Sequence, residues 1–295
     1  MIEGDYFMKI SVIITTYNQQ QQTDLVLQSL NEQKKIDLSH IEVIVVDDGS
    51  FMTYEPIETH FKLVVIHQVN AGRAAARNKG IQAATHDILI FVDGDRVVDE
   101  QFIYHYMTQY KEGLNIGRVK EIYSRDLSDY KLIKEKIIRN QARMPAYIYH
   151  TSILYDQCGL SDSGIIWITT FSGNMCISKK LIEKAGLFNE SFENWGFEHF
   201  ELGYRLHQLN VPFFQVDAVN YHLAHARDLN ELEKNIRDSI SHFMALHHDL
   251  ILEKLQAFLL GTLALQDLEI NKKANWLKDH SEAIYTKAGE RGVAK

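Results

Sequence analysis

Four short and almost continuously apolar runs in the first third of the chain constrain its fold more than any other feature. Strands that are covered on both faces have this pattern, because neither face presents side chains to solvent. Helical patterns follow the first and third runs, at residues 23–33, with Thr23 or Asp24 as the expected cap, and at 73–84. This order predicts an α/β fold with a parallel sheet and right-handed βαβ crossovers. The runs are ISVIITT (10–16), IEVIVVDD (41–48), KLVVIHQ (62–68) and DILIFVD (87–93).

The remainder of the chain is predicted to be more helical. From about residue 100 to 165 the pattern is helical, and SDYKLIKEKIIRNQARM has the spacing of an amphipathic helix. A strand-like PFFQVDAV (212–219) comes before a stretch that has helical patterns and no proline from Leu229 onward. The expected organisation is one domain at 8–227, with halves at 8–98 and 99–227, followed by a helical segment at 228–295.

Composition restricts the class of protein and its location. The 295 residues have a formal net charge of −8, which argues against a general nucleic-acid-binding protein. Cys158 and Cys176 are too few for a disulfide framework and are expected to be reduced thiols. The N-terminal segment lacks the pattern of a signal peptide, and no apolar window reaches the roughly 18 residues of a membrane-spanning helix. The sequence therefore predicts a cytoplasmic protein that binds no nucleic acid.

Polar side chains directly follow three of the predicted strands. TTYN, DDGS and DGD stand at the carboxyl ends of the first, second and fourth runs. Ligands bind at this edge of α/β sheets, so the three clusters are expected to form one site. Within it, one of Asp93 and Asp95 can bind a hard divalent cation while the other meets a hydroxyl. The alternative is an exposed Asp-Gly turn around Gly94.

Asp47 and Arg77 each have two interpretations. Asp47 can accept hydrogen bonds from a base edge or a ribose hydroxyl, or it can belong to a helix cap or a turn. Arg73 and Arg77 are four residues apart and share one helix face. Arg77 can bind a diphosphate through its guanidinium fork, or it can form an ion pair with Asp47 or Asp93.

Four motifs, in this order and spacing, resemble family 2 glycosyltransferases of the GT-A fold. The resemblance implies a Rossmann-like mixed α/β sheet, here with a C-terminal helical extension. It also implies a UDP-sugar donor whose uracil and ribose contact Thr16, Asn18, Asp47 and Asp93, and a divalent ion, Mn²⁺ or Mg²⁺, on Asp95. Residues 8–98 are then the nucleotide-binding half, and 99–227 the acceptor-binding half. The motifs are SVIITTYN, VIVVDDGS, NAGRAAARNKGI and ILIFVDGD.

The stretch from Phe171 to Leu206 extends the resemblance to chondroitin-polymerase-like and galactosyltransferase-like enzymes. Ser172 and Gly173 are expected to approach the donor diphosphate or the acceptor, since glycine allows close backbone contact. These relatives have a Tyr-His after the following strand, which implies that His222 completes the metal site, with His225 as the alternative. The implied donor-binding set is Thr16, Asn18, Asp47, Arg77, Asp93, Gly94, Ser172 and Gly173.

The acceptor site is implied by a Trp-Gly turn. In the relatives this turn precedes a Glu-Asp pair at a helix N-terminus, and the aspartate is the general base. Here the turn begins at Trp195, which is expected to stack on a sugar, and the pair is Glu198 and His199. A histidine suits proton abstraction near neutral pH, and Glu198 is the other candidate. The base is therefore assigned jointly to His199 and Glu198, with Glu198 also contacting the acceptor.

Together these features predict a metal-dependent inverting glycosyltransferase. It would move a hexose or N-acetylhexosamine from a UDP-sugar to an acceptor hydroxyl, in glycan or glycoconjugate synthesis. Sugar, lipid-linked and peptide acceptors stay open. The C-terminal helices are candidates for acceptor recognition, homo-oligomer contacts or peripheral membrane contact. The alternatives are a nucleotidyltransferase, which the lack of glycine in TTYNQQQQ disfavours, and a non-catalytic UDP-sugar-binding protein, which both aspartates and His222 disfavour.

Overall fold

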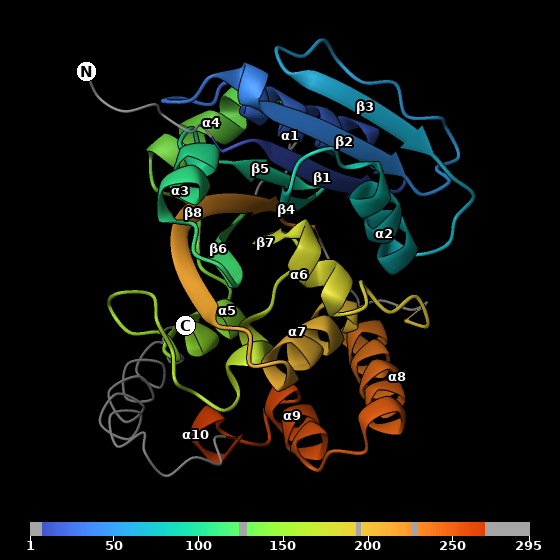
Figure 1. Cartoon of the computed structure of the whole chain (residues 1–295), viewed down its shortest axis with the longest axis vertical. Coiled ribbons are helices and arrows are strands. Elements are labelled where there is room, and N and C mark those ends of the chain that lie inside the picture. The colour runs from blue at the N-terminus through green and yellow to red at the C-terminus, as the bar shows by residue number, and fades with distance from the viewer. Residues whose placement is uncertain (1–7, 124–128, 193–195, 226–228, 269–295) are drawn as a thin grey trace, which may run out of the picture.

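The structure, a computed structural model, describes residues 8–123, 129–192, 196–225 and 229–268. A mixed eight-stranded sheet runs through them in the order β3-β2-β1-β4-β7-β6-β8-β5 (Figure 1). The strands are β1 Ile10–Thr16, β2 Ile41–Asp47, β3 Lys62–His67, β4 Ile88–Asp93, β5 Arg96–Val98, β6 Leu114–Ile122, β7 Asn174–Ser178 and β8 Phe213–Leu223. The helices are α1 Gln20–Asn31, α2 Arg73–Ala83, α3 Phe102–Gln109, α4 Tyr130–Ile138, α5 Ala146–Ser152, α6 Lys179–Lys184, α7 Glu198–Gln208, α8 Leu229–His247, α9 Ile251–Leu259 and α10 Leu265–Leu268, with short 3-10 turns η1 Leu38–His40 and η2 Ile166–Thr169.

The four apolar runs form the parallel part of the sheet. β1 pairs in parallel with β2 on one side and with β4 on the other, and β3 pairs in parallel with β2. Every residue of β2 is buried, as expected of an inner strand covered on both faces. The prediction of four parallel strands is confirmed.

The second half of the chain makes the sheet mixed. β7 pairs antiparallel with β4 and β6, while β8 pairs in parallel with β6 and antiparallel with β5. β8 continues past the predicted strand and ends at Leu223, whose amide donates to the carbonyl of Asp95 over 2.9 Å. Its register places His222 opposite Arg96 of β5. The last strand therefore brings His222 to the aspartates that follow β4.

The predicted start of α1 is wrong by about one turn. The helix begins at Gln20, so neither Thr23 nor Asp24 is its cap. The Thr23 hydroxyl lies inside the first turn, where it donates to the carbonyl of Gln19 over 2.9 Å and lies 2.8 Å from the hydroxyl of Thr16. A threonine hydroxyl that bonds to the preceding turn in this way is compatible with the helix interior.

The expectation of helix throughout residues 100–165 is also wrong, because β6 occupies Leu114–Ile122. Its sequence, LNIGRVKEI, is too polar to show a buried-strand pattern. Pairing with β7 and β8 determines its conformation instead, since strand preference depends strongly on tertiary context. The amphipathic helix predicted between 128 and 144 is present as α4.

The sheet separates two apolar cores. One core packs the sheet against α1 and α3, through residues such as Val26 and Phe102. The other packs it against α2, α6 and α7, and it includes Phe243 of α8 and Leu252 of α9. Figure 1 shows α8 and α9 beside α7, and α10 next to α9, at the end of the molecule away from β3. No helix in the described ranges is both long and apolar enough to cross a membrane.

A buried carboxylate on β2 accepts hydrogen bonds from β1, from β3 and from the segment just before β4. Glu42 is 1% exposed and accepts hydrogen bonds from the Ser11 hydroxyl, the Lys62 ammonium, and both the amide and the hydroxyl of Thr85. Burial alone would raise its pKa, but these hydrogen bonds, that of Lys62 first, lower it to about 2. Glu42 is therefore ionised in the folded chain down to more acidic pH than in the unfolded chain.

We expect Glu42 to make the fold acid-sensitive. Because its folded pKa is lowered, its stabilising contribution is present above pH 4.5 and is lost as the pH falls toward 2. Between pH 6 and pH 2, the free energy of unfolding of the wild type should fall by about 3 kcal/mol more than that of Glu42→Gln. Chemical denaturation across this range measures the difference, with exposed Glu58→Gln as control. Parallel pH profiles for wild type and Glu42→Gln would contradict this account.

Candidate active site

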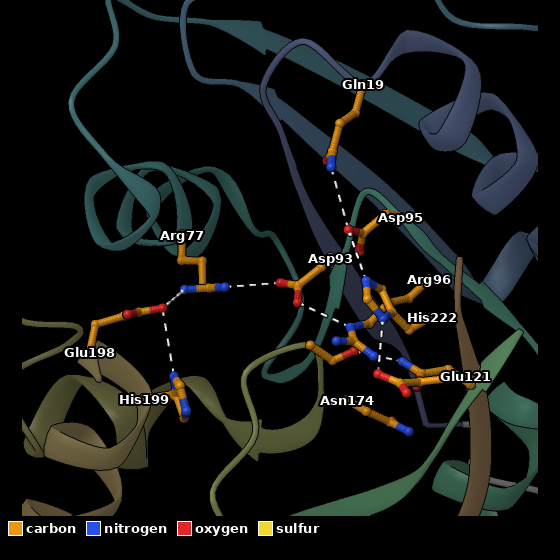
Figure 2. A network of polar contacts seen from close by, with 12 residues as sticks. Gln19, Arg77, Asp93, Asp95, Arg96, Glu121, Asn174, Glu198, His199 and His222 are labelled. Atoms are coloured by element: carbon orange, nitrogen blue, oxygen red, sulfur yellow. Dashed lines mark hydrogen bonds and ion pairs between the residues drawn. The ribbon is translucent and has the colours of Figure 1, made fainter. Parts of the chain in front are cut away.

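The candidate site lies where β1, β2 and β4 end, and a tight turn places its first carboxylates. Asp93 ends β4, and Gly94 and Asp95 form the turn into β5. The amide of Gly94 donates to the carbonyl of Thr15 over 3.0 Å, and a Cβ on Gly94 would lie 2.9 Å from that oxygen. The predicted Asp-Gly turn is present, but Asp95 is only 15% exposed. The turn thus presents its carboxylates to a polar network rather than to open solvent (Figure 2).

Arg77 of α2 joins two carboxylates in the interior. Its Nη2 lies 2.9 Å from Asp93 Oδ1 and its Nη1 lies 2.7 Å from Glu198 Oε1, and the arginine side chain is 4% exposed. Of the two partners that the sequence suggested for Arg77, the structure selects Asp93 rather than Asp47. Burial opposes ionisation of Asp93, but the Arg77 charge lowers its pKa. The same arginine connects α2 and the end of β4 to α7.

Glu198 and His199, the two candidate bases, have different surroundings in the first turn of α7. Glu198 is buried, and its pKa is lowered, despite burial, by the neighbouring His199 ring and by the charge of Arg77. His199 Nδ1 lies 3.8 Å from Glu198 Oε1. Its ring packs against Phe171 and Phe200, at centroid distances of 6.1 and 4.2 Å. Glu198 is therefore a weak base that is held in an ion pair, whereas His199 has no arginine partner within the described part of the chain.

Asp95, His222 and His225 converge at the opposite end of the network. One ligand atom from each lies within 4.8 Å of the others, a donor set that suits a divalent ion. His222 Nε2 lies 3.5 Å from Asp95 Oδ2, and Nδ1, across the ring, lies 3.4 Å from Glu121 Oε1. Burial lowers the pKa of His222, but hydrogen bonding to Asp95 and then to Glu121 raises it overall. The structure thus brings together the predicted ligands, and it adds the alternative ligand His225.

Asp47 and Asn18, which were predicted to contact the sugar-nucleotide donor, accept hydrogen bonds from the loop that follows β2. Asp47 Oδ1 accepts from the amide and the hydroxyl of Ser50, and Oδ2 accepts from the amide of Tyr54. Asn18 Oδ1 accepts from the amide of Phe51. The turn that the sequence offered as the alternative for Asp47 is therefore present.

Asp48 binds the loop that leads into α2. Its carboxylate accepts from the amides of Ala71 and Gly72, directly before α2 begins at Arg73. This contact fixes the start of the helix that presents Arg77. The two aspartates thus bind different segments: Asp47 binds the loop that follows β2, and Asp48 binds the residues directly before α2.

Gly173 lies against Asp93 and Arg96, and the approach of Ser172 and Gly173 to a donor or acceptor stays a prediction. A Cβ on Gly173 would come within 2.3 Å of Asp93 Oδ2 and 2.6 Å of Arg96 Nε, so only glycine allows this approach. Ser172, the preceding residue, is buried. Trp195, the predicted acceptor contact, lies outside the described residues.

Sequence reasoning missed Arg96 and Glu121. Arg96 is buried, donates to Asp93 Oδ2 over 3.2 Å, and stacks 4.5 Å from the centroid of the Phe171 ring. It directly follows the DGD motif, and this position next to two carboxylates was an available signal. Nothing in the sequence pointed to Glu121 as a site residue, because the segment around it was predicted to be helical.

Arg77 should be required for folding stability. Replacement by leucine leaves Glu198 buried without its arginine and Asp93 with Arg96 alone, and breaking a buried ion pair typically costs about 3–5 kcal/mol. Chemical denaturation of Arg77→Leu at pH 7.5 measures this loss. Lys79→Leu, at an exposed position of the same helix, is the control and should change stability by less than about 0.5 kcal/mol. Equal effects of the two substitutions would show that the Arg77 pairs do not stabilise the fold.

The fold and the grouping of these residues define a glycosyltransferase of the GT-A fold. The profile of Glycosyl transferase family 2 matches residues 11–167, more than half of the chain. The chain belongs to this family and is a glycosyltransferase, which sets aside the nucleotidyltransferase alternative.

Several relatives match most of this chain. The glycosyltransferase YfnE of Bacillus subtilis is 26% identical over 80% of this chain and 69% of its own length. Hyaluronan synthase of Pasteurella multocida is 27% identical over 89% of this chain. Chondroitin synthase of Escherichia coli is 29% identical over 76% of this chain. The chain covers only 29% and 36% of the two synthases' own lengths. The predicted relation to chondroitin-polymerase-like enzymes is confirmed.

Solved structures share the fold. TarS (1–349) of Staphylococcus aureus in complex with UDP-GlcNAc gives a TM-score of 0.54 at 18% identity, covering 80% of this chain and 67% of that one. Mannosyltransferase PcManGT from Pyrobaculum calidifontis, in complex with GDP-Man and Mn²⁺, gives a TM-score of 0.58 at 15% identity. The match covers 98% of this chain and 77% of that one. At these identities the likeness establishes the fold alone, and it confirms the predicted GT-A architecture.

Proposed function

We propose that the protein transfers a hexose or N-acetylhexosamine from a UDP-sugar to an acceptor hydroxyl, with inversion and with the help of a divalent ion. The observation that most supports this function is the convergence of Asp95, His222 and His225 beside Asp93. Similarity to hyaluronan and chondroitin synthases and to a UDP-GlcNAc complex favours a uridine donor. The GDP-Man complex makes a guanosine donor the alternative to test.

The residues at the metal end fit a transition-metal ion better than Mg²⁺. Asp95 and His222 would hold the ion, with His225 as a third ligand. Mg²⁺ prefers oxygen ligands and retained waters, whereas Mn²⁺, although it also favours oxygen ligands, accepts imidazole nitrogen more readily than Mg²⁺ does. When bound, the ion would neutralise negative charge on the departing diphosphate. Gly94 and Gly173 keep the backbone close to this position, and Thr16, Asn18 and Asp47 border the proposed nucleoside site.

The base proposed for the acceptor proton is His199. Glu198 is bound to Arg77 with a lowered pKa, which makes it a poor proton acceptor. Its carboxylate instead faces His199 Nδ1 and would orient the ring so that Nε2 receives the proton. Figure 2 shows Glu198 and His199 on one side of Asp93 and the metal-ligand cluster on the other. A base and a leaving group on opposite sides suit displacement with inversion.

The domain assignment stays part of this proposal: donor binding at 8–98, acceptor binding at 99–227 with Trp195 and Glu198, and a helical segment at 228–295 for acceptor or partner contacts. A cytoplasmic location rests on the two free thiols, Cys158 and Cys176.

Release of nucleoside diphosphate from a panel of UDP-sugars and GDP-mannose, with Mn²⁺, Mg²⁺ or EDTA, tests the donor and the metal. We expect one UDP-sugar to be hydrolysed slowly with Mn²⁺, with EDTA abolishing turnover. Asp95→Asn should lower this rate by about 10³-fold, because the ion supplies several kcal/mol of charge stabilisation. Exposed Asp217→Asn is the matched control. A rate that EDTA leaves unchanged would contradict metal dependence, and preference for GDP-mannose would contradict the uridine donor.

Kinetics of His199→Ala and Glu198→Gln test the base. Loss of a general base typically lowers kcat by about 10²–10⁴-fold, and we expect this of His199→Ala with the donor KM unchanged. Glu198→Gln should lower kcat less and should also lower thermal stability, because it breaks the pair with Arg77. If His199→Ala retains more than about a tenth of the wild-type rate while a folded Glu198→Gln is inactive, the base is Glu198.

A further inference from the structure

We propose that Glu121 is the positioning residue of the metal site: its carboxylate accepts the Nδ1 proton of His222 and so leaves Nε2 free to bind the ion. The inference rests on the proposed metal-dependent function. Glu121 lies on β6, outside every motif that the sequence analysis identified.

Strand register places Glu121 beside His222. In the parallel pairing of β6 with β8, Glu121 is the direct partner of His222. Directly paired residues on neighbouring strands project to the same face. An isolated bridge to Arg143 holds the Glu121 backbone, with hydrogen bonds of 2.7 and 2.9 Å. The side chain thus reaches His222 from a fixed part of the sheet.

The two nitrogens of His222 face different carboxylates. Nδ1 lies 3.4 Å from Glu121 Oε1, and Nε2 lies 3.5 Å from Asp95 Oδ2 (Figure 2). The second oxygen of Glu121 accepts from the Tyr123 hydroxyl over 2.6 Å. Each carboxylate oxygen of Glu121 therefore has a protein partner, His222 Nδ1 for one and the Tyr123 hydroxyl for the other. This geometry is that of a carboxylate that acts through the histidine rather than one that binds the ion.

The chemistry of imidazole explains why such a partner matters. A neutral imidazole has one N–H and one lone pair, and the hydrogen bond at one nitrogen decides which nitrogen is free. A carboxylate at Nδ1 selects the Nδ1–H tautomer, fixes the ring orientation and strengthens Nε2 as a ligand. His222 is 97% buried, counted on its side chain, so solvent has little access to replace this partner. Without Glu121, His222 would also populate the Nε2–H tautomer, which cannot bind an ion at Nε2.

Two readouts on Glu121→Gln test the inference. The first is the Mn²⁺ dissociation constant, from the electron paramagnetic resonance signal of free Mn²⁺ at pH 8. We expect about 10–100-fold weaker binding. The second is the His222 tautomer in metal-free protein, from ¹⁵N-histidine spectra. We expect Nδ1–H in the wild type and a mixture, or Nε2–H, in Glu121→Gln. Tyr123→Phe, which keeps the carboxylate, is the matched control and should retain the Nδ1–H tautomer and bind Mn²⁺ within about threefold of the wild type.

Unchanged Mn²⁺ affinity in Glu121→Gln, or an Nε2–H tautomer in the wild type, would overturn the role of Glu121. The absence of Mn²⁺ binding by the wild type would instead contradict the proposed metal site, and the tautomer in metal-free protein would still decide the role of Glu121. Glu121→Asp guards against a folding defect in Glu121→Gln: it should restore the Nδ1–H tautomer, and failure to do so in folded protein also counts against the inference.

Discussion

The buried guanidinium of Arg77 is the interaction on which the rest of the site depends. It lies between Asp93, at the end of β4, and Glu198, at the start of α7, which are 105 residues apart in the chain. Buried carboxylates require a positive partner, and one arginine serves both. Because Arg77 is on α2, three elements meet at one cation. Helix α7 is thereby held with His199 directed to the edge where the strands end.

Strand register imposes the second constraint. Asp95 follows β4, and the histidines come from the end of β8, more than 120 residues later in the chain. The antiparallel pairing of β5 with β8 sets His222 next to the aspartate turn, and the parallel pairing of β6 with β8 sets Glu121 behind it. Both ends of the network are thus assembled from residues that are distant in sequence. Asp93 and Arg96 lie between the two ends and are linked by a hydrogen bond.

Much of this arrangement could be predicted from local pattern. The four parallel strands followed from their apolar runs, and Asp93 and Asp95 from their place after β4. His222 and the Glu198–His199 pair followed from resemblance to family 2 enzymes. Pairing partners could not be predicted, because sequence does not specify which carboxylate a buried arginine will meet. Glu121 was missed because β6 is too polar to resemble a buried strand and becomes one only through its neighbours.

The central claim is that one ion lies between the Asp95–His222 end of this network and the donor diphosphate. Electron spin echo spectroscopy of the Mn²⁺-loaded protein with UDP tests it most directly, since couplings to imidazole nitrogen and to phosphorus appear in the same spectrum. We expect both couplings, with the nitrogen coupling reduced in His222→Ala. Phosphorus coupling without any nitrogen coupling would show that the ion binds UDP but not these histidines, and would contradict the account.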